Sequence, residues 1–102
     1  MQPRDVSAVI CTKNSVAGIQ CCLTSLREAG VGELIVVDAN STDGTREVAH
    51  QLADRVFEDP GTGLGQARNL GIAQTSGSLV LNMGSDNVMS AGQLDLLIRD
   101  LV

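Results

Sequence analysis

Two carboxylates stand where a hydrophobic run gives way to polar residues. Asp38 closes the run 33–38, and Asp86, followed by Asn87, comes soon after the run 78–83. A carboxylate at the tip of a buried strand loses hydration unless a donor replaces the water, and a ribose hydroxyl or a base N–H would serve Asp38. Asp86 could hold a divalent cation against a diphosphate, because Mg²⁺ and Mn²⁺ take oxygen ligands and often need only one or two from the protein. A simple turn before a helix is the alternative for Asp86 and Asn87.

A third carboxylate, Asp43, follows Asp38 by five positions, at the start of a predicted helix. Asp43, Ser41 or Thr42 could cap that helix by accepting its free N–H groups, which is an ordinary use of these residue types. The same cluster could instead belong to a ligand site at the end of the strand. The residues alone leave both interpretations open.

Three closely spaced glycines, Gly61, Gly63 and Gly65, partly match a dinucleotide-binding motif. Their spacing is G-x-G-x-G and they follow the third predicted strand, whereas the motif requires G-x-G-x-x-G after the first. They therefore predict a tight loop that leads into a helix. Arg68 and Asn69, just inside that helix, could contact a phosphate or a carboxylate.

The other reactive side chains form no motif. Cys11, Cys21 and Cys22 show neither C-x-x-C spacing nor the even count of a secreted disulfide scaffold, so we expect reduced, mostly buried thiols. His50 falls within a helical pattern, and we expect a surface or half-buried histidine with no role.

Strands that alternate with helices must position these residues. Short aliphatic and β-branched runs without clean polar alternation are typical of strands that helices cover on both faces. A stripe with helical spacing follows the first run, and Gly30 is placed to end that helix. The sequence predicts strands near 6–11, 33–38, 55–58 and 78–83. It predicts a first helix over the stripe Val16, Ile19, Leu23 and Leu26, a second after Asp43 and a third from about Gln66 to Gln74. A last helix is predicted after Ser90, which has capping-box spacing to Gln93.

This alternation predicts an α/β fold with a mostly parallel sheet in three αβα layers. Ligands of such sheets bind beyond the carboxyl ends of the strands, near the point where the strand order reverses. The polar and glycine-rich segments that follow the strands are therefore the candidate site. No repeat or linker is visible, so residues 1–102 are predicted to form a single domain.

The composition argues against several classes of protein. A net charge of −5 disfavours binding of nucleic acid through its phosphates, and Phe57, the only aromatic residue, leaves no platform for stacked bases. No stretch approaches the ~20 apolar residues that cross a bilayer, and the N-terminus lacks the layout of a secretory signal. We expect a cytoplasmic protein, with association at the cytoplasmic side of a membrane left open.

Four ordered blocks of the sequence resemble the signatures of family 2 glycosyltransferases. They are AVICTKN at 8–14, VVDANSTDGT at 36–45, GLGQARNLGI at 63–72 and GSLVLNMGSDN at 77–87. The resemblance covers nearly the whole chain. It implies a Rossmann-like GT-A fold whose front half binds a nucleotide-diphosphate sugar, with Mn²⁺ or Mg²⁺ bridging the phosphates. It also implies transfer to an acceptor hydroxyl with inversion, in which a carboxylate base takes the proton and the metal stabilises the leaving diphosphate.

The resemblance implies roles for particular residues. The nucleotide-sugar-binding residues would be Thr12, Asn14, Asp38, Asn40, Ser41, Arg68 and Gly84, and the metal ligand would be Asp86. Within this set, Thr12 and Asn14 would line the nucleotide pocket, Asp38 would face the base or the ribose, and Arg68 would support the pocket.

Two positions depart from the family pattern. Ala39 stands where the family often has a second acid that reads the base, which leaves the choice of base open. Gly84 replaces the first acid of the Asp-x-Asp metal motif, which predicts modest metal affinity. The family's catalytic base and acceptor-binding half lie beyond this motif. We therefore expect a partial catalytic domain without activity of its own, with a face that truncation exposes to self-association.

Other functions match the residues differently. A nucleotide-binding remnant without catalysis fits them as well as a transferase does. A flavodoxin-like signalling or scaffold domain would need an acidic pair after the first strand and a late lysine, and no lysine follows Lys13. A nicotinamide-binding domain is disfavoured by the glycine spacing. The donor sugar and the acceptor are not identified by the sequence.

Overall fold

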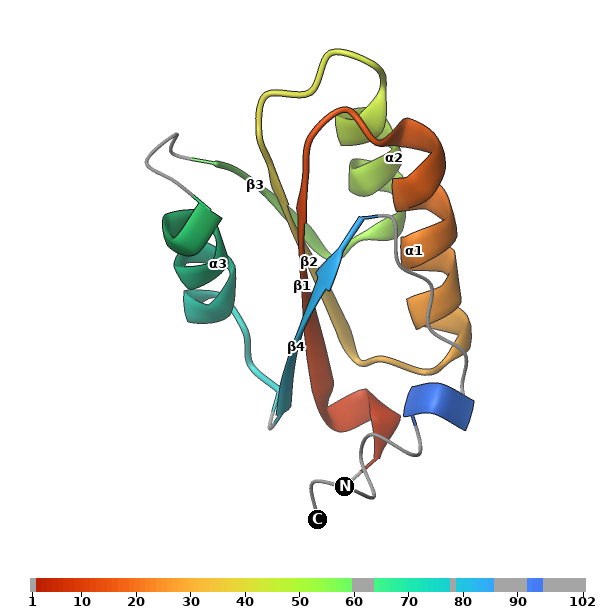
Figure 1. Ribbon diagram of the computed structural model, residues 1–102. Helices are drawn as coiled ribbons and strands as arrows, with labels where there is room; N and C mark the ends of the chain where they lie inside the picture. The colour runs from red at the N-terminus through yellow and green to blue at the C-terminus, as the bar shows by residue number, and fades with distance from the viewer. Residues whose placement is uncertain (1, 60–63, 78, 86–91, 95–102) are drawn as a thin grey trace.

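Parallel strands and three α-helices make up the part of the chain that the structure, a computed structural model, describes: residues 2–59, 64–77, 79–85 and 92–94 (Figure 1). The strands are β1 (Val6–Thr12), β2 (Glu33–Asp38), β3 (Arg55–Glu58) and β4 (Leu79–Gly84). The helices are α1 (Val16–Glu28), α2 (Thr45–Leu52) and α3 (Leu64–Ala73), and a short 3-10 helix, η1 (Pro3–Asp5), precedes β1. All four predicted strands are confirmed to within one residue.

The strand order of the sheet is β3-β2-β1-β4, and every neighbouring pair is parallel. The chain moves outward from β1 through β2 to β3, and it then returns to the other side of β1 to form β4. The strand order therefore reverses between β1 and β4, which is where open α/β sheets bind their ligands. The predicted parallel, Rossmann-like sheet is confirmed.

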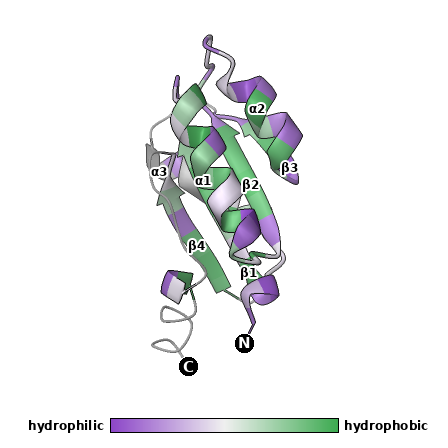
Figure 2. Ribbon diagram, turned by 90° about the vertical axis from the view of Figure 1, so that its right-hand side faces the viewer, coloured by the Kyte–Doolittle hydropathy of each residue, from purple (hydrophilic) through white to green (hydrophobic). Residues whose placement is uncertain are grey.

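Helices cover both faces of the sheet. Helices α1 and α2 lie on one face and α3 lies on the other, which confirms the three layers (Figure 1). Alternate side chains of β1 point to the α1 face, where Val6, Ala8 and Ile10 join Leu23 and Leu26 in a fully buried aliphatic cluster. Figure 2 shows this hydrophobic sheet behind helices that carry hydrophilic residues on their outer sides. Burial of the aliphatic surface is the main force that holds the layers together.

The helix boundaries follow local signals in the sequence. Gly30 ends α1 as predicted, because it adopts a left-handed conformation with φ +90° that suits glycine. Helix α3 begins two residues earlier than predicted and ends one residue earlier. Of the last predicted helix, residues 92–94 are described as helical, and Ser90 lies outside the described residues.

Helix α3 packs unusually close to the sheet at Gly71, which is buried. A Cβ atom at this position would lie 2.3 Å from Val9 Cγ1 and 3.3 Å from Val37 Cγ2. Both valines belong to the face of the sheet opposite α1. The absence of a side chain at Gly71 therefore sets the distance between α3 and strands β1 and β2.

All three cysteines are reduced thiols, as predicted, but their burial differs. Cys22 is buried and Cys11 is partly buried, whereas Cys21 is exposed, so the expectation of mostly buried thiols is wrong for Cys21. Successive helical residues are turned by about 100°, and the α1 face that buries Cys22 therefore leaves Cys21 outside. None of the described helices is long and apolar enough to span a membrane.

Candidate functional site

The register of the sheet brings several of the predicted site residues to one edge. Thr12 at the end of β1 pairs with Asp38 at the end of β2, and Cys11 pairs with Gly84 at the end of β4. Ser85, the next residue, is buried. Thr12, Asp38 and Gly84 therefore meet at the carboxyl edge of the sheet, next to the point where the strand order reverses.

The loop after β1 and the loop after β2 are joined by hydrogen bonds. The Ala39 N–H donates to the Thr12 carbonyl at 2.9 Å, and the Asn14 N–H donates to Ser41 Oγ at 2.9 Å. In return, Asn14 Oδ1 accepts the Thr42 N–H at 2.9 Å. The side chains of Asn14 and Ser41, which the resemblance assigns to the nucleotide, thus hold the two loops together.

Two asparagines shape these loops through their backbones. Asn14 and Asn40 have φ values of 47° and 54°, in the left-handed region that asparagine tolerates better than most residues. Asn40 is exposed at the end of β2. Asn14 is held between the loops, whereas the exposed side chain of Asn40 remains a candidate for ligand contact.

Asp43 connects the first turns of two helices. Its Oδ1 accepts the Thr45 N–H at 3.0 Å and the Thr45 hydroxyl, and its Oδ2 accepts the Val16 N–H at 3.2 Å. Thr45 and Val16 are the first residues of α2 and α1. The Thr45 hydroxyl, together with these N–H groups, lowers the pKa of Asp43 against the opposing effect of burial.

This geometry decides between the two interpretations of the 41–43 cluster. Asp43 does accept a free N–H group of α2, although the residue directly before the helix is Gly44, with φ +95°. Ser41 does not cap the helix, because its hydroxyl donates to Asp38. Asp43 is therefore a structural residue that ties the two helix ends, and with them the two loops, together.

The Asp38 carboxylate is completely buried and has donors within the chain. Its Oδ1 accepts the Ser41 hydroxyl at 2.6 Å, and its Oδ2 accepts the Ser41 N–H at 3.0 Å and Arg46 Nε at 3.3 Å. Desolvation predicts a donor for Asp38, and the folded loop and α2 supply such donors within the chain. The ligand contact that the resemblance implies for Asp38 stays a prediction.

Sequence reasoning missed Arg46. This residue lies in the first turn of α2, and besides Asp38 it pairs with Glu58 at the end of β3, with Nη1 3.2 Å from Oε1. Glu58 is the register partner of Asp38 in the sheet. The signal in the sequence was an arginine eight residues after a buried aspartate, which points to a pair only once α2 is placed beside the strand end.

Thr12 differs from its neighbours because its side chain has no partner. The residue is 5% exposed, and no group in the described part of the chain forms a hydrogen bond with its buried Oγ1. Buried hydroxyl groups are nearly always paired in folded proteins. Thr12 is therefore the predicted site residue whose side chain is most clearly left for a ligand.

The remaining predicted residues are placed less completely. Asp86, Asn87, Gly61 and Gly63 lie outside the described residues. Arg68 lies on α3, and only its place on the helix is described. The described residues contain no group of three or more His, Cys, Asp or Glu side chains that could hold a metal ion.

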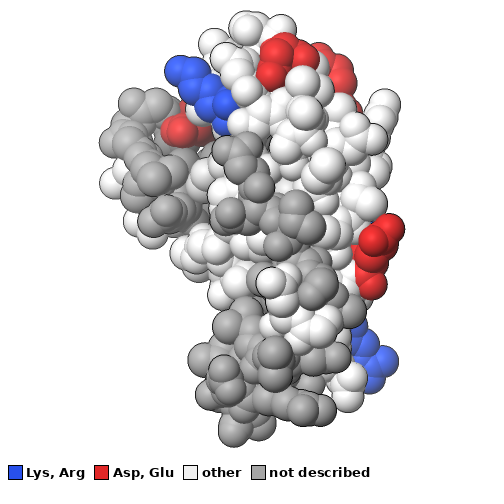
Figure 3. All heavy atoms as spheres, turned by 45° about the vertical axis from the view of Figure 1, so that its right-hand side comes forward, with Lys and Arg blue, Asp and Glu red and all other residues white. Residues whose placement is uncertain are grey.

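The charged groups near this edge have both signs. Lys13, Asp43 and Glu47 are exposed there. On the face drawn in Figure 3, acidic side chains gather at the end of the molecule where the strands finish, with basic side chains close by. The described charges at this edge therefore do not form a cationic site for a diphosphate.

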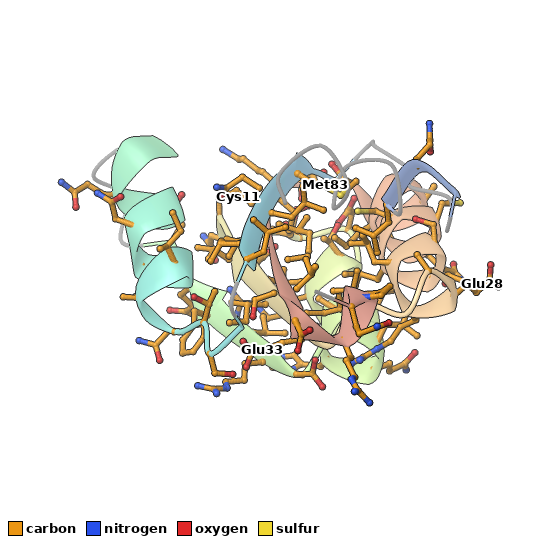
Figure 4. All side chains as sticks on the ribbon, turned by 90° about the horizontal axis from the view of Figure 1, so that it is seen from below. Cys11, Glu28, Glu33 and Met83 are labelled. Carbon is orange, nitrogen blue, oxygen red and sulfur yellow. The ribbon has the colours of Figure 1, made fainter. Side chains whose placement is uncertain are left out.

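A cavity of about 350 Å³ lies at the opposite, amino-terminal edge of the sheet. Glu33, at the start of β2, is the centre of its polar lining and is seen from this side in Figure 4. It accepts the Ser7 hydroxyl and the Ser76 N–H, each at 2.9 Å, and it pairs with Arg55 at 3.4 Å. These contacts join the amino-terminal ends of β1, β2 and β3 to the segment before β4. The cavity is therefore far from Thr12 and Asp38, and its central carboxylate is occupied by structural contacts.

Comparison with known proteins gives matches over nearly the whole chain. Residues 7–101 match the family described as Glycosyl transferase family 2. Glycosyltransferase AglE of Haloferax volcanii is 34% identical over 91 residues, which cover 79% of this chain and 30% of that protein.

Solved structures give the same result. Glucosyl-3-phosphoglycerate synthase of Mycobacterium tuberculosis, in complex with Mn²⁺, UDP and glucosyl-3-phosphoglycerate, matches with a TM-score of 0.79 and 29% identity over 94% of this chain and 39% of that one. The mannosyltransferase PcManGT of Pyrobaculum calidifontis has a similar fold, with a TM-score of 0.85 and 23% identity over 99% of this chain and 34% of that one. The chain thus spans 30% to 39% of the length of these proteins.

Proposed function

Because the chain belongs to glycosyl transferase family 2, we propose that the carboxyl edge of its sheet binds the nucleoside diphosphate of a sugar donor. The transfer that this binding serves moves the sugar to an acceptor hydroxyl with inversion. The observation that carries the proposal is Thr12, whose buried hydroxyl lacks a partner at the point where the strand order reverses. A ligand oxygen or N–H group at this edge would complete its hydrogen bonding.

The residues of the edge divide into two groups in this proposal. Thr12 and the exposed Asn40 contact the nucleotide directly. Asn14, Ser41 and Asp43 hold the two loops in the shape that receives it, since their side chains are engaged in hydrogen bonds between or within the loops. Preorganised loops lower the entropy that binding must overcome.

A divalent metal ion fits the chemistry of this edge. The described charges do not form a cationic site for a diphosphate, and the segment that begins at Asp86 follows Ser85, which is buried at the carboxyl end of β4. Asp86 would hold Mn²⁺ or Mg²⁺ through its carboxylate oxygens. When bound, the metal would stabilise the negative charge of the leaving diphosphate.

The chain's own residues then bind and orient the donor. Thr12 and Asn40 fix the nucleoside relative to the ends of β1 and β2, so that the diphosphate lies toward β4. No described residue is assigned as the base that takes the proton of the acceptor hydroxyl. The acceptor is proposed to bind through parts of the protein that correspond to the rest of the relatives' length.

Calorimetric titration tests the proposal. We expect the chain to bind UDP or GDP in the presence of Mn²⁺ and to bind it much more weakly without the metal. Thr12→Val should lower the affinity by about tenfold, because a valine keeps the shape but loses the hydroxyl contact.

The matched control is Thr24→Val, on the exposed side of α1, which should bind like the wild type. Thr12→Val should also be at least as stable as the wild type, because it removes an unpaired buried polar group. Absence of binding to either nucleotide with Mn²⁺, or equal affinity in Thr12→Val, contradicts the proposed site.

A further inference from the structure

Arg46 occupies an unusual position at the carboxyl edge. Its guanidinium group reaches from the first turn of α2 across the ends of β2 and β3, where Nε lies 3.3 Å from Asp38 Oδ2 and Nη1 lies 3.2 Å from Glu58 Oε1. The first carboxylate is fully buried, and the second is mostly exposed. Two of the three nitrogens of Arg46 are therefore fixed by carboxylates on neighbouring strands.

The third guanidinium nitrogen of Arg46, Nη2, is not paired with a carboxylate of the described residues. Arg46 Nη2 is buried and has no hydrogen-bond partner in the structure, and Thr12 Oγ1 is the only other buried side-chain atom found in this condition among the described residues. Both residues adjoin Asp38: Thr12 is its register partner on β1, and Arg46 is its ion-pair partner. A charged N–H donor that is withdrawn from water without a partner is costly, so an acceptor brought by a ligand would remove that cost.

The charge of the corner indicates what kind of acceptor fits. One guanidinium group pairs with two carboxylates, so the cluster formed by Arg46, Asp38 and Glu58 has a net negative charge. A phosphate oxygen would be repelled by the two carboxylates, whereas a neutral oxygen would meet the free N–H group without that penalty. The guanidinium is also held in place by these two pairs, and its Nη2 atom is buried, so a neutral acceptor for Nη2 adds little further ordering cost.

We propose that Arg46 contacts the nucleoside part of the donor: its Nη2 donates to a neutral oxygen, either a ribose hydroxyl or a base carbonyl. This inference rests on the proposed nucleotide site and extends it to a residue that the sequence signatures do not include. It also gives Asp38 a positioning role, because Asp38 fixes the guanidinium that faces the ligand. Ala39 supplies no acid at the position where the family often has one, so Arg46 is a candidate for a contact that the Ala39 position does not provide.

The test compares two arginines that pair with glutamates at opposite edges of the same sheet. Arg46→Lys keeps a positive charge for Asp38 but loses Nη2, and Arg55→Lys makes the same change beside Glu33, 3.4 Å away. We expect Arg46→Lys to weaken binding of the preferred nucleoside diphosphate with Mn²⁺ by about tenfold. The phosphate-free nucleoside, followed by NMR titration, should lose affinity by the same factor. Arg55→Lys should change neither affinity.

The outcomes separate this inference from the proposed function. If the wild type binds no nucleoside diphosphate, both fail together. If the wild type binds and Arg46→Lys binds equally well, the contact through Arg46 is wrong and the nucleotide site stands. A loss with the diphosphate but none with the nucleoside would mean a phosphate contact and would also overturn the inference. The 2′-deoxynucleotide then locates the contact. If Arg46→Lys still binds it more weakly than the wild type does, the contact is to the base or to the remaining ribose hydroxyl. If the two proteins bind it equally well, the contact is to the 2′-hydroxyl.

A second variant guards against misfolding of Arg46→Lys. Glu58→Gln removes the mostly exposed carboxylate that holds Nη1, and such an exposed pair contributes little to stability. We expect nucleoside affinity to fall by about twofold to threefold with an unchanged unfolding temperature, because the guanidinium is less firmly held. Unchanged affinity in Glu58→Gln as well as in Arg46→Lys contradicts the proposal.

Discussion

At the residue scale, the polar side chains at the carboxyl edge of the sheet differ in whether they have hydrogen-bond partners. Thr12 Oγ1 and Arg46 Nη2 are buried without partners, whereas Asn14, Ser41 and Asp43 are engaged with neighbouring chain. A hydrogen-bonding group that is satisfied inside the protein gains little from a ligand, and an unsatisfied one gains much. The atoms without a partner, more than the residue types, therefore indicate the proposed ligand site.

The lowered pKa of Asp43 predicts a pH-dependent contribution to stability. A depressed carboxylate pKa stabilises the folded state fully above the unfolded value of 3.8, and this contribution is lost as the pH falls through the lower, folded pKa. Wild type should therefore be more stable than Asp43→Asn at pH 6, and the difference should shrink below pH 3.8.

Thermal unfolding of both proteins between pH 2 and pH 7 measures this difference. Asp59→Asn, a nearby acid outside the two loops, serves as the comparison. A stability difference for Asp43→Asn that does not change with pH would show that the carboxylate is not held as described.

The metal assignment is tested at Asp86. Asp86→Ala should lower Mn²⁺-dependent affinity for the nucleoside diphosphate by about tenfold or more while leaving the unfolding temperature unchanged.

Gly84→Asp should raise that affinity, because it restores the first acid of the motif, and Gly84 lies in β4 without the positive φ that would exclude a side chain. Titration of Mn²⁺ with nucleotide measures both, and equal affinity in wild type and Asp86→Ala would leave Asp86-Asn87 as a simple turn.

At the scale of elements, the helices are coupled by their ends and by close packing. Asp43 joins the amino ends of α1 and α2, so the loops after β1 and β2 behave as one unit. On the other face, α3 approaches the sheet at Gly71, where a Cβ would overlap Val9. The first contact shapes the site, and the second sets the position of the helix that carries Arg68.

Gly71→Ala should destabilise the protein by about 1–3 kcal/mol, because α3 must move away from β1 to admit the methyl group. Ile72→Ala, on the exposed side of the same helix, is the control and should change stability far less. Urea unfolding measures both. A Gly71→Ala variant as stable as the wild type would mean that α3 is not packed as closely as described.

At the scale of the whole molecule, the described residues form a four-stranded parallel sheet whose carboxyl edge is the proposed nucleotide site. It spans 30% to 39% of the relatives' length, and none of its described residues is assigned as the catalytic base. We expect residues 1–102 on their own to bind nucleotide but not to transfer sugar. The measurement is product formation from a nucleotide sugar with Asp86→Ala as the blank, and turnover clearly above that blank would refute the expectation.

Much of this protein follows from the sequence alone. The apolar runs at 6–11, 33–38 and 78–83 predict three strands, because a strand that is covered on both faces must be largely apolar, and the short run 55–58 predicts the remaining strand, β3. The alternation with helices predicts the parallel sheet, and the ordered blocks at 8–14, 36–45, 63–72 and 77–87 predict the family. These properties depend on local pattern and chain order, which a sequence states directly.

Only the tertiary structure decided which polar groups remain for a ligand. Asn14 and Ser41 look like ligand residues in the sequence, yet the Asn14 backbone and side chain bond to residues 27 and 28 positions away, and Ser41 binds Asp38. The position of Arg46, eight residues after Asp38, indicates an ion pair only once α2 is placed, and there Arg46 pairs with both Asp38 and Glu58. The physical reason is that a hydrogen bond depends on distance and direction between atoms, and those are set only when neighbouring parallel strands bring their loops side by side.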